Sequence, residues 1–159
     1  MSESIKKIEP IAAVAIAAIL IAVSTVPTLP LQNVYAAGED HEDGGDGREG
    51  CTPGFWKNHP FPEPYTPKTQ FNDVFGVTIA GDEDLTLGEA LNLGGGGDNV
   101  LARQAVAALL NAASDEIDFE FTVEEVIEKV QDAIASGDPE EIEDLKDEFD
   151  RENNRGCPL

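Results

Sequence analysis

Residues 98–114 read DNVLARQAVAALLNAAS, and after the first two residues the only polar side chains before the closing serine are Arg103, Gln104 and Asn111. A helix that is apolar almost all round is normally buried. We therefore expect this helix, with Asp98 as its N-cap, to form the centre of a small helical bundle. A buried or half-buried Arg103 is expected to pair with one of the many carboxylates of the chain.

Two further helices are predicted downstream, each with its own start and stop signals. The first begins at Thr122, where Glu125 completes a capping box, and ends at Gly137. The second begins at Asp138, is followed by a proline at its first position, and ends at Gly156. Apolar residues at helical spacing are expected to face the core of the bundle: Val123, Val126, Ile127, Val130, Ile134, Ile142, Leu145 and Phe149.

The segments upstream of the central helix are shorter. Residues 69–81, TQFNDVFGVTIAG, are compatible with a short helix or a short strand, and we expect the element to end at Gly81. A short helix is predicted from Thr86, closed by the run Gly94–Gly97. This run lacks the Gly-Lys-Ser/Thr ending of a phosphate loop, so we expect it to supply positive φ angles and tight packing instead.

Residues 51–68, CTPGFWKNHPFPEPYTPK, contain five prolines, which exclude regular structure over most of this segment. We call it the strap and expect it to be extended and polyproline-like. A single helical turn is predicted where Thr52 precedes Pro53. Four aromatic side chains are expected to face the domain: Phe55, Trp56, Phe61 and Tyr65.

The two cysteines of the chain, Cys51 and Cys157, lie near the two ends of the segment predicted to fold. In an exported chain two cysteines indicate one disulfide, and closing a loop of about 100 residues stabilises a fold by roughly 4–5 kcal/mol. The fold class predicted is all-α: a small helical bundle with an irregular Pro-rich N-terminal strap closed by one disulfide.

No catalytic residue is assigned from the sequence. His59 with the cysteines lacks the paired ligand spacing of a zinc site, and no nucleophile motif accompanies it. Trp56 is expected in the core, although with Lys57 it could form an exposed recognition pair. The residues that we single out as a recognition or structural motif are Phe55, Trp56, Lys57, Asn58, His59, Arg103 and Asn111.

The N-terminus predicts export. Lys6 and Lys7 precede an uninterrupted apolar run over residues 11–23, which is too short for a membrane span of about 20 residues but typical of a signal peptide. We expect cleavage after Ala36, so that residues 1–36 are a signal peptide and no membrane span follows. Residues 37–50, rich in Gly and acids, are expected to be a disordered leader before the domain at 51–159. An alternative for the apolar run is the polymerising helix of archaeal type IV pilins, which the two prolines that follow it disfavour.

The chain has 32 acidic and 10 basic residues, for a net charge of -22. Such a polyanion is a poor partner for nucleic acids and anionic membranes, attracts cations and basic surfaces, and suits a saline environment. The acidic leader is a candidate for weak Ca²⁺ binding, and a mature N-terminus at Glu39 would create a Cu²⁺ site with His41. The candidate metal ligands are Asp40, His41, Glu42, Asp43 and Asp46.

Five motifs in this order resemble a domain found in exported proteins of archaea and bacteria: CTPGFWKNH, LNLGGGG, LARQAVAALLNAA, FTVEEVIEKVQ and GCPL. The resemblance covers residues 50–159 and implies export and a self-contained domain without an established activity. We therefore expect a secreted or cell-surface module that serves structure or interaction with a protein or cell-surface partner. The alternatives are an extracellular cation-binding protein and a pilin-like subunit.

Overall fold

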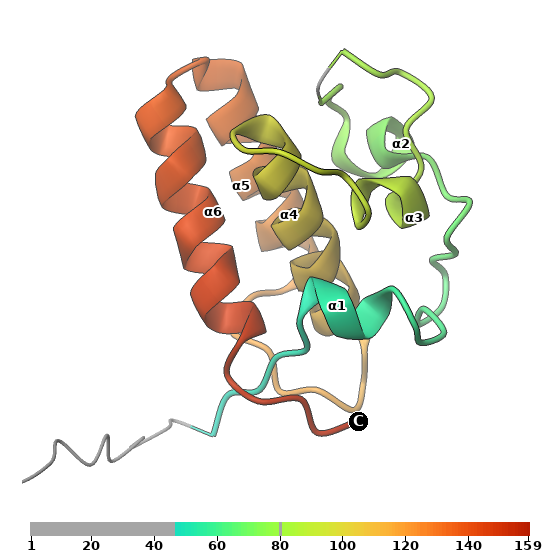
Figure 1. The fold of residues 1–159 in the computed structure, drawn as a ribbon. Helices are drawn as coiled ribbons and strands as arrows, with labels where there is room; N and C mark the ends of the chain where they lie inside the picture. Colours follow the sequence, from blue (N-terminus) through green and yellow to red (C-terminus); the bar gives the residue numbers. More distant parts are fainter. Residues whose placement is uncertain (1–46, 80) are drawn as a thin grey trace, which may run out of the picture. The chain divides into compact units, whose positions relative to one another are not determined.

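The computed structural model describes residues 47–79 and 81–159, and these residues form the all-α fold that the sequence predicts (Figure 1). The predicted signal peptide, the pilin alternative and nearly all of the acidic leader lie outside the described residues. Within the described residues, β pairing is limited to three isolated bridges. The helices are α1 (Pro53–Trp56), α2 (Phe71–Phe75), α3 (Leu87–Ala90), α4 (Asp98–Ala113), α5 (Val123–Ser136) and α6 (Pro139–Asn153).

Helix α4 is the buried centre of the bundle, as its sequence predicts. Every side chain from Ala105 to Leu110 is fully buried. The long helices α5 and α6 pack against α4 and against each other, and the short helices α1 and α3 also pack on α4 (Figure 1). None of the helices in the described part is long and apolar enough to cross a membrane.

The predicted starts of α5 and α6 are confirmed, and both depend on local hydrogen bonds. Thr122 and Glu125 form the reciprocal capping box at the start of α5, and Asp138 caps α6. The predicted N-cap of α4 is off by one residue: Gly97 is the cap, and Asp98 is already helical. The predicted end of α6 at Gly156 is wrong, since the helix ends at Asn153.

The segment predicted as a short helix or a short strand contains the helix α2 (Phe71–Phe75), which ends at Gly76 rather than at the predicted Gly81. Gly76 adopts a left-handed conformation, with φ of 67°, which terminates the helix. Phe71 and Phe75, one turn apart, are both buried, and their rings stack at 4.3 Å. Residues four apart share a face in a helix and in a strand alike, so the spacing of the two rings is compatible with both alternatives. The structure shows the helix, with both rings buried in the core.

The disulfide between Cys51 and Cys157 closes the described domain, with 4.5 Å between the two Cα atoms. A backbone bridge between Gly50 and Gly156 lies beside it. A Cβ at Gly50 would overlap the carbonyl oxygen of Glu152, so the chain comes this close to α6 only with glycine at that position. The strap therefore begins at a point fixed both covalently and by backbone packing.

Candidate functional site

Asn111 joins the strap to two helices through hydrogen bonds beneath the disulfide. It is fully buried on α4. Its Oδ1 accepts hydrogen bonds from the Cys51 backbone N–H at 3.0 Å and from the Trp56 indole N–H at 2.9 Å. Its Nδ2 donates to the Cys51 carbonyl at 2.9 Å and to Asn153 Oδ1 at 2.8 Å. With every donor and acceptor used, Asn111 and Trp56 act in this arrangement as structural anchors.

The same network continues along α4 and α6 through residues that sequence analysis did not single out together. Asn153 Nδ2 donates to Gln104 Oε1 at 2.9 Å, and Gln104 Nε2 donates to Asp150 at 2.6 Å. A signal for this was present in the sequence. Gln104 and Asn111 lie seven residues apart, and this spacing places them on one face of an otherwise apolar helix.

Cys51 and His59 do not form a reactive pair. Cys51 is oxidised in the disulfide, so it offers no thiolate. His59 Nδ1 donates to the Phe55 carbonyl at 2.8 Å, and the imidazole stacks on the Phe55 ring with the centroids 3.7 Å apart. Asn58 likewise donates to the carbonyl of Gly54 at 3.0 Å. These contacts fix the end of α1.

No cluster of three or more His, Cys, Asp or Glu residues among the described residues could hold a metal ion. The metal candidates of the leader lie outside those residues: Asp40, His41, Glu42, Asp43 and Asp46.

Arg103 does not make the expected ion pair with any carboxylate in the part of the chain that the structure describes. Its guanidinium donates instead to the Leu93 carbonyl and, at 3.4 Å, to the Gly95 carbonyl. These two carbonyls belong to the loop that follows α3. They accept the hydrogen bonds of the guanidinium in place of a carboxylate. Gly95 and Gly97 have positive φ angles as expected, but a Cβ at Gly94 would meet nothing within 4 Å, so the expected tight packing is absent there.

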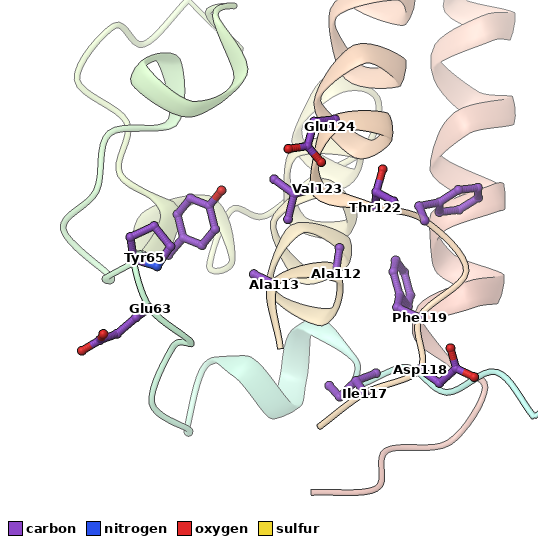
Figure 2. Close-up of a pocket in the computed structure, with 12 residues that line it drawn as sticks. Glu63, Tyr65, Ala112, Ala113, Ile117, Asp118, Phe119, Thr122, Val123 and Glu124 are labelled. Carbon is purple, nitrogen blue, oxygen red and sulfur yellow. The ribbon is translucent and has the colours of Figure 1, made fainter. Parts of the chain in front are cut away.

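A cavity of about 500 Å³ lies between the strap and the helices α4 and α5 (Figure 2). Figure 2 shows the Tyr65 ring pointing across the gap toward Val123 and Glu124, with Ala112 and Ala113 beside it. Burial raises the pKa of the Tyr65 phenol, and the Glu124 carboxylate raises it further, so the O–H group stays a hydrogen-bond donor. We call this cavity the acidic groove, and it is lined by Glu63, Pro64, Tyr65, Ala112, Ala113, Ile117, Asp118, Phe119, Phe121, Thr122, Val123 and Glu124.

A second cavity, of about 430 Å³, lies between the end of α1, the strap and α3. Two lysines and His59 line it, together with a single carboxylate, Glu89. We call it the lysine cavity. Its lining residues are Trp56, Lys57, His59, Phe61, Pro67, Lys68, Thr86, Gly88, Glu89, Leu91 and Asn92.

No protein-family model, curated protein or solved structure matches the chain. The resemblance to exported domains of archaea and bacteria therefore rests on the sequence motifs alone. The two cavities, with the charges that line them, are the features of the described residues that bear most directly on function.

Proposed function

We propose that this chain is an exported, disulfide-closed helical module that binds a partner protein and has no catalytic activity of its own. The observation that supports this proposal is the acidic groove on a chain of net charge -22. The partner that suits the groove is a protein segment that presents a lysine or arginine side chain.

The lining of the acidic groove matches the two chemical parts of such a side chain. Lysine and arginine carry a long apolar stem and a cationic end. Ala112, Ala113 and Val123 offer apolar surface for the stem. The carboxylates of Asp118 and Glu124 attract the cationic end, and no lysine or arginine is among the described lining residues.

Two basic side chains contact lining residues of the acidic groove, and both are already engaged. Arg48 donates to the Phe119 carbonyl at 3.0 Å and pairs with Glu120 at 3.5 Å. Lys129 lies 4.9 Å from the centroid of the Phe121 ring and pairs with Glu148 at 3.0 Å. It therefore leaves the groove carboxylates available to a partner.

The charge of the whole chain favours the same class of partner. A net charge of -22 attracts basic surfaces over long range and speeds their encounter, while the groove supplies a local, shaped contact. The oxidation of Cys51 and the structural contacts of His59 support a role without catalysis. The disulfide supports export, because such bonds persist in oxidising compartments.

The proposal is tested with a fluorescently labelled peptide of alternating arginine and glycine, titrated with the purified chain at low salt. The double variant Asp118→Asn/Glu124→Gln removes two groove charges. Glu141→Gln/Asp144→Asn is the matched control, because it makes the same charge change at exposed positions on α6. We expect the groove variant to weaken binding about tenfold, as for the loss of well-placed charges, and the control to change it by about twofold or less.

Equal losses in the two double variants would show that the peptide responds only to overall charge, and would overturn the proposed groove. Absence of binding by the unmodified chain would overturn it as well. Circular dichroism of each variant confirms that the helices are retained.

A further inference from the structure

We propose that the lysine cavity is a second binding site, for a small monocarboxylate with an apolar body. This inference is independent of the acidic groove, since the two cavities share no lining residue. It rests on two lysines that line this cavity and have no carboxylate partner among the described residues.

Eight of the ten basic residues lie in the described ranges. Lys57 and Lys68 are exposed, and within those ranges neither makes an ion pair, although acids outnumber bases by 32 to 10 in the chain. Both line the lysine cavity. The six other basic residues bond to carboxylates or to backbone carbonyls: Arg48, Arg103, Lys129, Lys146, Arg151 and Arg155.

The charge balance of the cavity selects an anion with one negative charge. Two lysines and one glutamate line it, which leaves a net charge of +1 when His59 is neutral. Glu89 stays ionised, because hydrogen bonds from the Thr86 hydroxyl and backbone N–H lower the pKa of its carboxyl. These bonds also hold Glu89 to the start of α3. The cavity therefore presents a net positive charge to a ligand.

The rest of the lining and the size of the cavity favour a small ligand over a macromolecule. Phe61, Pro67 and Leu91 supply apolar surface beside the lysines. The volume of about 430 Å³ falls in the range of about 300–1,000 Å³ that is usual for small-molecule sites. An acidic protein or polysaccharide would be repelled by the remaining surface of a chain of net charge -22, whereas a monoanion carries little charge to be repelled.

Backbone contacts between the strap and α3 hold the walls of the lysine cavity in place. The Gly88 N–H donates to the Pro67 carbonyl at 3.0 Å, and the Leu87 N–H donates to the Thr69 carbonyl at 2.9 Å. A Cβ at Gly88 would lie 2.8 Å from the Pro67 carbonyl oxygen, so the two segments are in close contact. Trp56 is anchored by its bond to Asn111. A ligand would therefore meet walls that are already positioned, which lowers the entropic cost of binding.

Trp56 supplies the readout, because it is the only tryptophan of the chain and lines this cavity. Phenylacetate is titrated into the purified chain while tryptophan emission is followed, with phenylacetamide as the uncharged analogue. We expect saturable binding of phenylacetate and at least about tenfold weaker binding of phenylacetamide, the factor that corresponds to about 1.4 kcal/mol.

The variant Lys57→Gln/Lys68→Gln should weaken phenylacetate binding by about tenfold or more, as expected when charged hydrogen bonds are lost. The control Lys129→Gln/Lys146→Gln removes the same charge from side chains that are paired elsewhere, and should change the affinity by about twofold or less. Backbone amide shifts in NMR spectra should move for Lys57, Lys68 and Gly88 on titration.

Equal binding of phenylacetamide, or equal losses in the two double variants, would overturn the proposal. So would the absence of both emission and amide shifts. If the acidic peptide EDHEDGGD binds in a lysine-dependent manner while phenylacetate does not, the cavity docks an acidic segment and the small-ligand assignment is wrong.

Discussion

Asn111 decides how the start of the strap meets the helices, although it is one polar residue in an apolar helix. Its amide bonds to Cys51, Trp56 and Asn153, which lie up to 60 residues away along the chain. In a buried site the loss of any of these hydrogen bonds lowers the stability of the fold, because the donor or acceptor left without a partner cannot bond to water.

The substitution Asn111→Asp tests this role with almost no change of shape. It places a carboxylate oxygen where Nδ2 now donates to the Cys51 carbonyl and to Asn153. We expect the free energy of unfolding to fall by about 3 kcal/mol or more, since two donors are replaced by an acceptor in a buried site. Urea denaturation followed by Trp56 emission measures it.

Asn58→Ala is the control for this prediction, because Asn58 is exposed and makes one hydrogen bond to Gly54. It should cost about 1 kcal/mol or less. If Asn111→Asp proved no more costly than this control, Asn111 would not anchor the strap.

For individual residues, the sequence indicated which side chains were unusual but not which hydrogen-bond partners they would have. Asn111 and Arg103 both stand out as polar groups in an apolar helix. The partners of Arg103 are the backbone carbonyls of Leu93 and Gly95 rather than a carboxylate. Partner choice depends on tertiary approach, which a single sequence does not contain.

Among the helices, the starts with a side-chain cap were predictable, whereas the start of α4, which lacks one, and several ends were not. The capping box of Thr122 and Glu125 depends on residues three apart, and so it can be recognised from the sequence. The sequence predicted that α2 ends at Gly81, whereas it ends at Gly76. Both glycines have positive φ angles, so either one could have terminated the helix.

The capping box of α5 predicts a specific pH response. Hydrogen bonds from the Thr122 backbone and hydroxyl lower the pKa of the Glu125 carboxyl. Because the folded-state pKa is depressed, this contribution to stability is present above the unfolded-state pKa of about 4.3 and is lost as the pH falls through the folded-state pKa. In Thr122→Val the hydroxyl bond is gone, so the pKa of Glu125 should rise toward its ordinary value.

Carboxyl carbon shifts measured by NMR across the acidic range follow this titration directly. Glu89 is the internal control, because its pKa is lowered by its own capping box with Thr86 and should not respond to Thr122→Val. An unchanged titration of Glu125 in the variant would contradict the assignment.

The disulfide acts on the domain as a whole, because it joins positions 106 residues apart. The two cavities also depend on the fold of the whole domain, since each is lined by segments that are distant in the sequence. The acidic groove needs the strap beside α4 and α5, and the lysine cavity needs it beside α3. Neither could be predicted from sequence. Trp56, Lys57 and Tyr65 were singled out individually, whereas the groove carboxylates Asp118 and Glu124 were not.

Reduction of the disulfide should lower the free energy of unfolding by about 4–5 kcal/mol, the loop-closure contribution expected for about 100 residues. Urea denaturation with and without reductant measures the difference. Asn111 still holds the Cys51 backbone after reduction, so Trp56 emission of the folded state should change little. Superimposable denaturation curves would contradict this prediction. They would show that the packing of Gly50 against α6, and not the disulfide, holds the start of the strap to the C-terminal segment.

Salt should separate the two binding sites, because the charge of the whole chain acts on their ligands in opposite directions. A basic peptide is attracted both by the acidic groove and by the net charge of -22. A monocarboxylate is attracted by Lys57 and Lys68 but repelled by the rest of the chain. Salt shortens the Debye length from about 10 Å at 0.1 M to about 3 Å at 1 M, so it weakens long-range terms of either sign.

Between these salt concentrations we expect the affinity for the arginine–glycine peptide to fall by about tenfold or more, because every screened contribution is attractive. The affinity for phenylacetate should change by about threefold or less, because screening removes the opposing repulsion together with part of the attraction. Parallel titrations by peptide anisotropy and Trp56 emission measure both. If phenylacetate binding fell as steeply as peptide binding, its attraction would come from long-range charge, and the paired lysines would not be the contact that holds the carboxylate.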